Sequence, residues 1–179
     1  MPCRLLDLAP FLSLLLSIPA LGCSGSADVV PSGPSQANPL DADEQSLLDL
    51  VNDLRVSNAA APLTGCVTLN VSASTHADDM RDRGYLKDVT PEGATPRQRA
   101  CEAGYASACS ETTAMAELVA SGNYAPDLTL AQWTKDAATQ TLLVDPGLVV
   151  IGIGFSVGGD SPVWAADFGG AVEASCTGQ

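Results

Sequence analysis

The sequence predicts one α+β domain, with helices first and an antiparallel hairpin at the end. In the first two thirds of the chain, apolar residues recur at three- and four-residue steps, which is the period of a helix. The period changes at residues 149–157, where β-branched residues and glycines predict a buried strand. A turn at Gly158-Gly159-Asp160 then leads into a second strand at 163–168, which completes the hairpin.

The first two helices are predicted from their start and stop residues. Asp41 and Glu44 have the spacing of a capping pair, and an apolar stripe continues from there to Ser57. The second helix is predicted to begin near residues 70–72. It ends at Gly84, because glycine adopts the left-handed conformation that stops a helix.

Three further helices are predicted from shorter signals. Thr95 precedes a proline and stands three residues before a glutamine, which is the pattern of a capped helix start. Met115, Leu118 and Val119 have helical spacing and predict a short helix that ends before a glycine. Thr129 has the same capping spacing to a glutamine, so the last helix is expected to begin there.

The composition excludes some partners. Acidic residues outnumber basic ones by 21 to 8, and the formal net charge is −13. Nucleic acids and anionic lipid headgroups bind to clusters of lysine and arginine, because they carry negative charge. We therefore expect neither as an electrostatic partner. A chain of 179 residues is long enough for one domain with a sizeable core.

The N-terminus has the features of an export signal. An uncharged apolar run of 15 residues, 8–22, is too short to span a membrane, which takes about 20 residues. It has the length of a signal-peptide core, so residues 1–22 are predicted to be a signal peptide. Residues 20–23 resemble a bacterial lipoprotein box, in which Cys23 would receive a lipid and become the mature N-terminus. Ordinary cleavage that leaves Cys23 free is the alternative.

The cysteine count favours lipidation. Without the signal, five cysteines remain, an odd number for an exported chain, and a lipid on Cys23 leaves four that can all pair. Of the three possible pairings we expect Cys101–Cys109, which closes a short loop, and Cys66–Cys176, which ties down the C-terminus. Residues 23–40 are predicted to be the lipid-anchored cysteine and a flexible tether rich in serine, proline and glycine. Residues 41–179 are predicted to form the folded domain.

Several short motifs occur in a fixed order along residues 44–170: Ala73-x-x-His76-Ala77-x-x-Met80, Gly84-Tyr85, Pro91-x-Gly93, Thr95-Pro96-x-x-Arg99, Ala103-Gly104-Tyr105, Trp133, Asp145-Pro146, Ile151-Gly-Ile-Gly154 and Trp164-x-x-Asp167-Phe168-Gly169. Together they resemble the bacterial branch of the CAP superfamily, also called SCP-like, which includes cysteine-rich secretory proteins, antigen 5 and pathogenesis-related proteins. The resemblance implies a three-layer α-β-α sandwich with a small antiparallel sheet and a cleft over it.

In that family two histidines and acidic residues line the cleft, and some members bind a divalent metal there. The resemblance places Asp88 and Thr139 at the two histidine positions and Glu111 at a glutamate position. The chain has one histidine, so a two-histidine site cannot form. We therefore expect no metal and no cofactor, although Asp88 and Glu111 could contribute to a hard-cation site that has more oxygen ligands. Residues 135–141 either keep the family's turn or continue as helix.

Four other residues are interpreted as structural. His76 stands between apolar neighbours on the second helix, so it is expected to be a hydrogen-bonded packing residue. Trp133 and Trp164 are expected in the core, and Asp167 is expected to accept hydrogen bonds from backbone amides.

The resulting hypothesis is a membrane-tethered, non-enzymatic binding module at the bacterial cell envelope. Its partners would be the membrane, through the N-terminal lipid, and an unidentified envelope ligand or protein. Two alternatives remain open: a hydrolase that uses Asp88 and Glu111, and a purely structural envelope protein.

Overall fold

A computed structural model describes residues 39–176 of the chain. The predicted signal peptide, Cys23 and most of the predicted tether lie outside these residues. The helices are α1 (Ala42–Ser57), α2 (Val67–Arg83), α3 (Pro96–Glu102), α4 (Pro126–Trp133) and α5 (Ala137–Leu143), with short 3-10 turns at η1 (Ala106–Cys109) and η2 (Ala174–Cys176). The strands are β1 (Thr64–Gly65), β2 (Met115–Ser121), β3 (Val150–Ser156) and β4 (Val163–Gly169).

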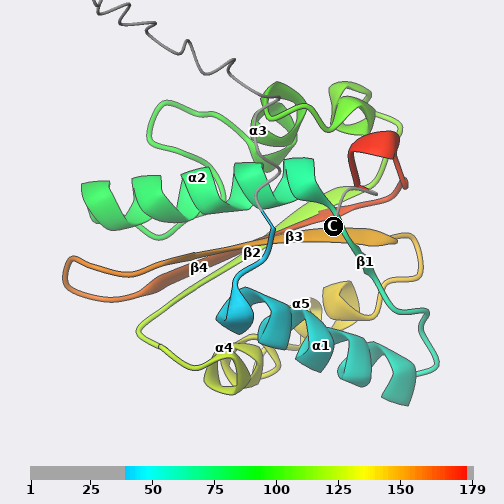
Figure 1. The fold of residues 1–179 in the computed structure, drawn as a ribbon, viewed down its shortest axis with the longest axis horizontal. Helices are drawn as coiled ribbons and strands as arrows, with labels where there is room; N and C mark the ends of the chain where they lie inside the picture. Colours follow the sequence, from blue (N-terminus) through cyan, green and yellow to red (C-terminus); the bar gives the residue numbers. More distant parts are fainter. Residues whose placement is uncertain (1–38, 177–179) are drawn as a thin grey trace, which may run out of the picture. The chain divides into compact units, whose positions relative to one another are not determined.

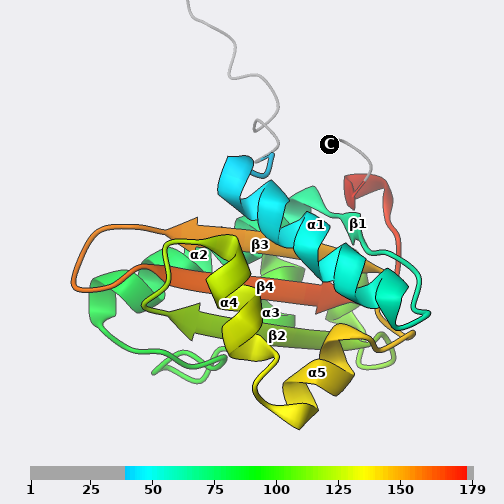
Figure 2. The ribbon, with the colours of Figure 1, turned by 90° about the horizontal axis from the view of Figure 1, so that it is seen from below.

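The domain is a three-layer α-β-α sandwich, as predicted. The sheet lies in the middle, with α2 and α3 on one face and α1, α4 and α5 on the other (Figure 1). The strand order is β1-β3-β4-β2, so β1 and β2 form the two edges (Figure 2). β3 and β4 form the predicted antiparallel hairpin, and β2 pairs antiparallel with β4. β1, which was not predicted, pairs parallel with β3 over two residues.

Two of the predicted helix starts are confirmed by their caps. The Asp41 side chain accepts hydrogen bonds from the backbone N–H groups of Asp43 and Glu44, and the Glu44 side chain accepts one from the Asp41 N–H. Thr95 and Gln98 form the same reciprocal box at the start of α3. Gly84, with φ at +67°, ends α2 in the left-handed conformation, where a side chain would be strained.

Two other starts lie earlier than expected. α2 begins at Val67 directly after Cys66, some residues before the predicted 70–72. α4 begins at Pro126 and not at Thr129, because a proline at the first position presets the helical φ. The Thr129 hydroxyl instead hydrogen-bonds to the carbonyl of Ala125 inside the helix.

The helix predicted around Met115 is wrong, because residues 115–121 form strand β2. Met115 and Val119 pack toward α2 and α3, whereas Ala116, Leu118 and Ala120 pack toward α1, α4 and α5. This alternation is the period of a strand. The spacing of these residues also fits a helix, but pairing of all seven residues with β4 stabilises the strand.

The glycines of β3 allow α2 to lie directly on the sheet. A Cβ atom at Gly152 would stand 2.1 Å from the Leu69 backbone carbon, and one at Gly154 would stand 2.3 Å from the Ser74 nitrogen. Both distances are far below van der Waals contact, so only glycine fits at these positions. The opposite layer holds the larger apolar cluster, with Trp133 and Trp164 in the core as predicted, at 4% and 0% exposure.

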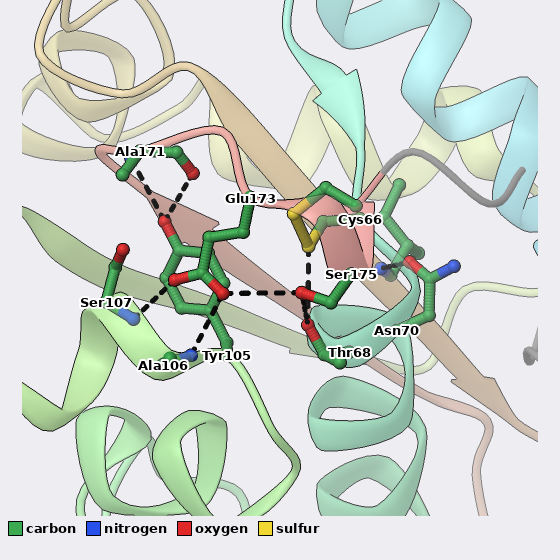
Figure 3. The surroundings of a disulfide bond; sticks show 11 residues. Cys66, Thr68, Asn70, Tyr105, Ala106, Ser107, Ala171, Glu173 and Ser175 are labelled. Carbon is green, nitrogen blue, oxygen red and sulfur yellow. Dashed lines mark hydrogen bonds between the residues drawn. A yellow bond between two sulfur atoms is a disulfide. The ribbon is translucent and has the colours of Figure 1, made fainter.

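The C-terminus is fastened to the start of α2 (Figure 3). The structure has the two expected disulfide pairs, Cys66–Cys176 and Cys101–Cys109. Near Cys176, the Glu173 carboxylate accepts hydrogen bonds from the backbone of Ala106 and Ser107. Among residues 39–176, no helix has the length and apolarity that crossing a membrane requires.

Candidate functional site

A cavity of about 500 Å³ lies between α3, the start of β2 and the loops on either side of α3. It brings together two of the residues that the sequence singled out, Asp88 and Glu111. Both are exposed, and the Glu111 side chain has 92% of its surface open to solvent. The other lining residues come from α3 and β2: Thr95, Pro96, Arg97, Gln98, Met115, Ala116 and Glu117.

Thr139 does not line this cavity, contrary to the family match. It lies in the first turn of α5, where its backbone N–H donates a 3.0 Å hydrogen bond to Asp136 Oδ1. Of the two conformations open for residues 135–141, the chain therefore has a helix from Ala137. The capped start of α5 places Thr139 in the helical layer on the other face of the sheet (Figure 2).

Two arginines of α3 hold the rim of the cavity. Arg97 donates to the backbone carbonyls of Ala108, Ser110 and Thr113, which fixes the segment that leads into β2. Arg99 donates a 2.9 Å hydrogen bond to the Asp88 carbonyl, which fixes the loop after α2. The exposed carboxylates therefore stand on loops whose backbones are anchored.

Glu117, on β2, is the charged residue that the sequence analysis missed. Its side chain has no exposed surface, and its two carboxylate oxygens accept bonds of 2.9 and 2.8 Å from Arg99 Nη2. A lone glutamate within the apolar stretch 115–120 is the signal that could have found it.

Glu117 faces a second buried carboxyl, Asp167 on β4. The two residues are directly opposite in the β2–β4 register. Asp167 has 0% exposure, and no backbone amide among residues 39–176 donates a hydrogen bond to either of its carboxylate oxygens. Its expected role as an acceptor for backbone amides is therefore wrong.

The two carboxyls cannot both ionise freely. Burial, followed by repulsion from Asp167, raises the pKa of Glu117, and burial also raises the pKa of Asp167. Arg99 opposes both shifts with one positive charge. We therefore assign one shared proton and one negative charge to the pair at neutral pH, with the charge balanced by Arg99.

His76 is a packing residue, as predicted. It is 1% exposed, and its Nε2 lies 2.9 Å from the Lys87 carbonyl. Burial lowers the pKa of His76, and repulsion from Arg99 adds to the effect. The imidazole is therefore neutral at neutral pH and donates its Nε2–H to Lys87. The Glu117 carboxylate, 3.6 Å from Nε2, is beyond hydrogen-bond distance.

The residues present do not fit the divalent metal that some family members bind. The family's two histidine positions hold Asp88 and Thr139, and these lie in different places. Residues 39–176 contain no group of three or more histidine, cysteine, aspartate or glutamate side chains arranged to hold a metal ion. Two exposed carboxylates fall well short of the roughly six or more oxygens of a calcium site.

The three layers and the cavity beside α3 define the kind of domain. The model of the cysteine-rich secretory protein family, CAP, matches residues 48–168, which is more than half of the chain. The protein therefore belongs to the CAP family.

Individual relatives share the domain at low identity. An uncharacterized protein, YkwD, from Bacillus subtilis is 26% identical over 137 residues, which cover 76% of this chain and 49% of YkwD. The chain thus spans about half the length of that relative. An outer surface protein of Borrelia burgdorferi has a TM-score of 0.64 at 19% identity, with 74% of this chain and 97% of that one covered. An SCP-domain extracellular protein of Bacillus anthracis has a TM-score of 0.61 at 19% identity, with coverages of 73% and 44%.

Proposed function

We propose that this CAP protein is a non-enzymatic binding module that is held at the bacterial envelope by a lipid on Cys23. The supporting observation is the cavity of about 500 Å³, whose exposed carboxylates stand on anchored loops. An open cavity favours binding over a purely structural role.

The environments of the charged groups favour binding over hydrolysis. A general acid and a general base need different surroundings to hold different protonation states. Asp88 and Glu111 are both exposed to solvent. The one imidazole of the chain, in His76, is buried and hydrogen-bonded to Lys87. Asp88 and Glu111, the pair that the hydrolase alternative would use, therefore offer recognition groups and do not form a matched acid and base.

The binding role is tested by reversing the charge of the cavity. Full-length wild-type protein and the double variant Asp88→Lys/Glu111→Lys would each be used to capture partners from envelope extract. Loss of a specific partner by this variant supports the proposal. Asp53→Lys/Asp160→Lys is the control, since both residues are exposed, lie outside the cavity and change the net charge equally. Equal loss in both variants contradicts a role for the cavity.

The envelope location rests on the lipoprotein box and the odd cysteine count. It agrees with the fact that two structural relatives are an outer surface protein and an extracellular protein. A lipid-modified Cys23 predicts that the mature protein partitions into membranes. Cys23→Ser should release a processed protein into the soluble fraction or stop its maturation. A processed Cys23→Ser protein that stays in the membrane would disprove the anchor.

A further inference from the structure

The outer edge of β2 has a backbone that can be traced group by group. Gly170 donates to the Ala114 carbonyl at one end of the strand, and Gly122 donates to the Pro162 carbonyl at the other. In an antiparallel pair, hydrogen-bonded residues alternate with residues that point away. The even-numbered residues of β2 therefore bond to β4, and the N–H and C=O groups of residues 115, 117, 119 and 121 point outward.

Two side chains close the ends of this edge. Arg97 Nη2 donates a 2.6 Å hydrogen bond to the Thr113 carbonyl, and Trp133 Nε1 donates one of 3.1 Å to the Val119 carbonyl. Between them, the outward N–H and C=O groups of Met115 and Glu117 bond to nothing within residues 39–176. Glu117 is partly exposed although its side chain is fully buried, so its exposed atoms are backbone atoms.

A hollow lies on each side of this open edge. The cavity with Asp88 is on the α3 side. A second cavity of about 590 Å³, on the α5 side, is lined by Thr113, Thr141, Leu142, Asp145 and Leu148 among others, and it shares Met115 and Ala116 with the first. Successive side chains of a strand point to opposite faces. A strand added to β2 would therefore direct alternate side chains into the two cavities.

The charges around both cavities are acidic. Asp88 and Glu111 line the first cavity, and Glu111 and Asp145 line the second. The one lysine or arginine among the lining residues, Arg97, donates to three backbone carbonyls, and its Nε lies 3.7 Å from Glu111 Oε2. Asp88 and Asp145 therefore have no paired cation among the lining residues. A second copy of this chain also has a net charge of −13, so its carboxylates would be repelled by the carboxylates of the cavities. Charge complementarity selects a basic partner.

We propose that the Met115–Glu117 edge docks an extended peptide segment with basic side chains, which adds a strand to the sheet beside β2. The inference rests on the proposed binding function and names its ligand class. Backbone hydrogen bonds to Met115 and Glu117 supply affinity, and the two cavities supply selectivity for the alternate side chains.

The test measures binding of defined peptides to the full-length protein in detergent by fluorescence anisotropy. The probe is a labelled seven-residue peptide of alternating lysine and threonine. Two control peptides are compared with it. In one, glutamate replaces every lysine, and in the other, every backbone nitrogen of the lysine peptide is methylated. We expect the lysine peptide to bind, the glutamate peptide not to bind, and methylation to weaken binding by at least about tenfold.

A matched pair of variants locates the binding at the edge. Met115→Pro removes one outward N–H, a change that edge strands tolerate, and should weaken binding by about tenfold. Met115→Ala shortens the same side chain but keeps the N–H, and should bind within about threefold of wild type. Circular dichroism checks the fold, and if Met115→Pro does not fold, the methylated peptide decides.

Three results would overturn the proposal. They are no binding of the lysine peptide, equal binding of its methylated form, and a wild-type dimer in sedimentation that Met115→Pro abolishes. If the charge-reversal variant loses its captured partner while the lysine peptide fails to bind, the binding function stands and only the strand-addition inference fails.

Discussion

The two edges of the sheet differ in how far they are protected from pairing with another strand. At one edge β1 has only two residues, and a disulfide at the next position joins it to Cys176. At the other edge β2 has seven residues, and its outward backbone is open between Arg97 and Trp133. Exposed edges invite pairing with other chains, so proteins usually shorten or cover them. The contrast shows that residues 39–176 close one edge of the sheet and leave the other accessible.

The largest effect on the free energy of unfolding is expected from removing the disulfide that closes the β1 edge. Replacing Cys66 and Cys176 by serine removes a crosslink between residues 110 apart in sequence. The free energy of unfolding should fall by about 5 kcal/mol, because the unfolded chain regains the entropy of a long loop. Urea denaturation measures the loss, and hydrogen exchange should rise in β1 and η2 before β2.

The shorter disulfide is the control for that variant. Cys101 and Cys109 are only 8 residues apart. Serine at both positions should cost about 2.5 kcal/mol by the same loop-entropy argument. Equal losses in the two double variants would show that loop length does not set the difference between them.

A smaller effect should come from the buried carboxyl pair behind the open edge. The shared proton is held by the folded state above the ordinary carboxyl range, where the unfolded chain has already released it. The free energy of unfolding of the wild type should therefore fall as pH rises, by up to about 1.4 kcal/mol per pH unit. Asp167→Asn removes the second carboxyl and should flatten this slope between about pH 7 and 9.

That pH window isolates the pair from His76. The pKa of His76 is lowered in the folded state, so the imidazole is neutral there in both folded and unfolded chains. Asp53→Asn, at an exposed position of α1, is the control and should keep the wild-type slope. An unchanged slope in Asp167→Asn would mean that the pair does not hold the extra proton.

The smallest effect is expected on peptide binding, when the Val119 carbonyl of β2 is freed as an additional acceptor. Trp133→Phe removes the indole donor from the Val119 carbonyl and leaves unfilled space in the core, so it should cost about 2 kcal/mol in unfolding free energy. The freed acceptor should strengthen binding of the lysine–threonine peptide by about threefold. Trp164→Phe is the comparison, since its indole bonds to Asn123 and not to the edge. Stronger peptide binding in both variants would contradict the assignment.

The parts of the fold that the sequence predicted are those with local causes. Capping boxes at Asp41 and Thr95 and the glycine-spaced hairpin each depend on a few neighbouring residues, so their patterns are recognisable in one chain. β2 was missed because Met115, Leu118 and Val119 fit a helical spacing as well as an alternation. Only pairing with β4, far along the chain, decides between the two.

The candidate site was predicted in part for the same reason. Asp88 and Glu111 lie on loops that flank α3, and the family resemblance had assigned both to the cavity that they line. Thr139 was assigned by the family resemblance, but Asp136 caps a helix at this point of the chain and places Thr139 outside the cavity. Glu117 and Asp167 meet only through the strand register, which no spacing along the chain encodes.

The contact between α2 and the glycines of β3 sets the thickness of the upper layer. Because the backbone of α2 lies directly against the backbone of β3 at these glycines, no side chains separate the helix from the sheet there. Over β2 the cover passes to α3, a helix of 7 residues, and to the loops around it. The hollow beside Asp88 lies where this short helix and the loops, and not α2, cover the sheet. Alanine at position 152 or 154 would lift α2 off the sheet, and the dimensions of the binding cavity would change although neither residue lines it.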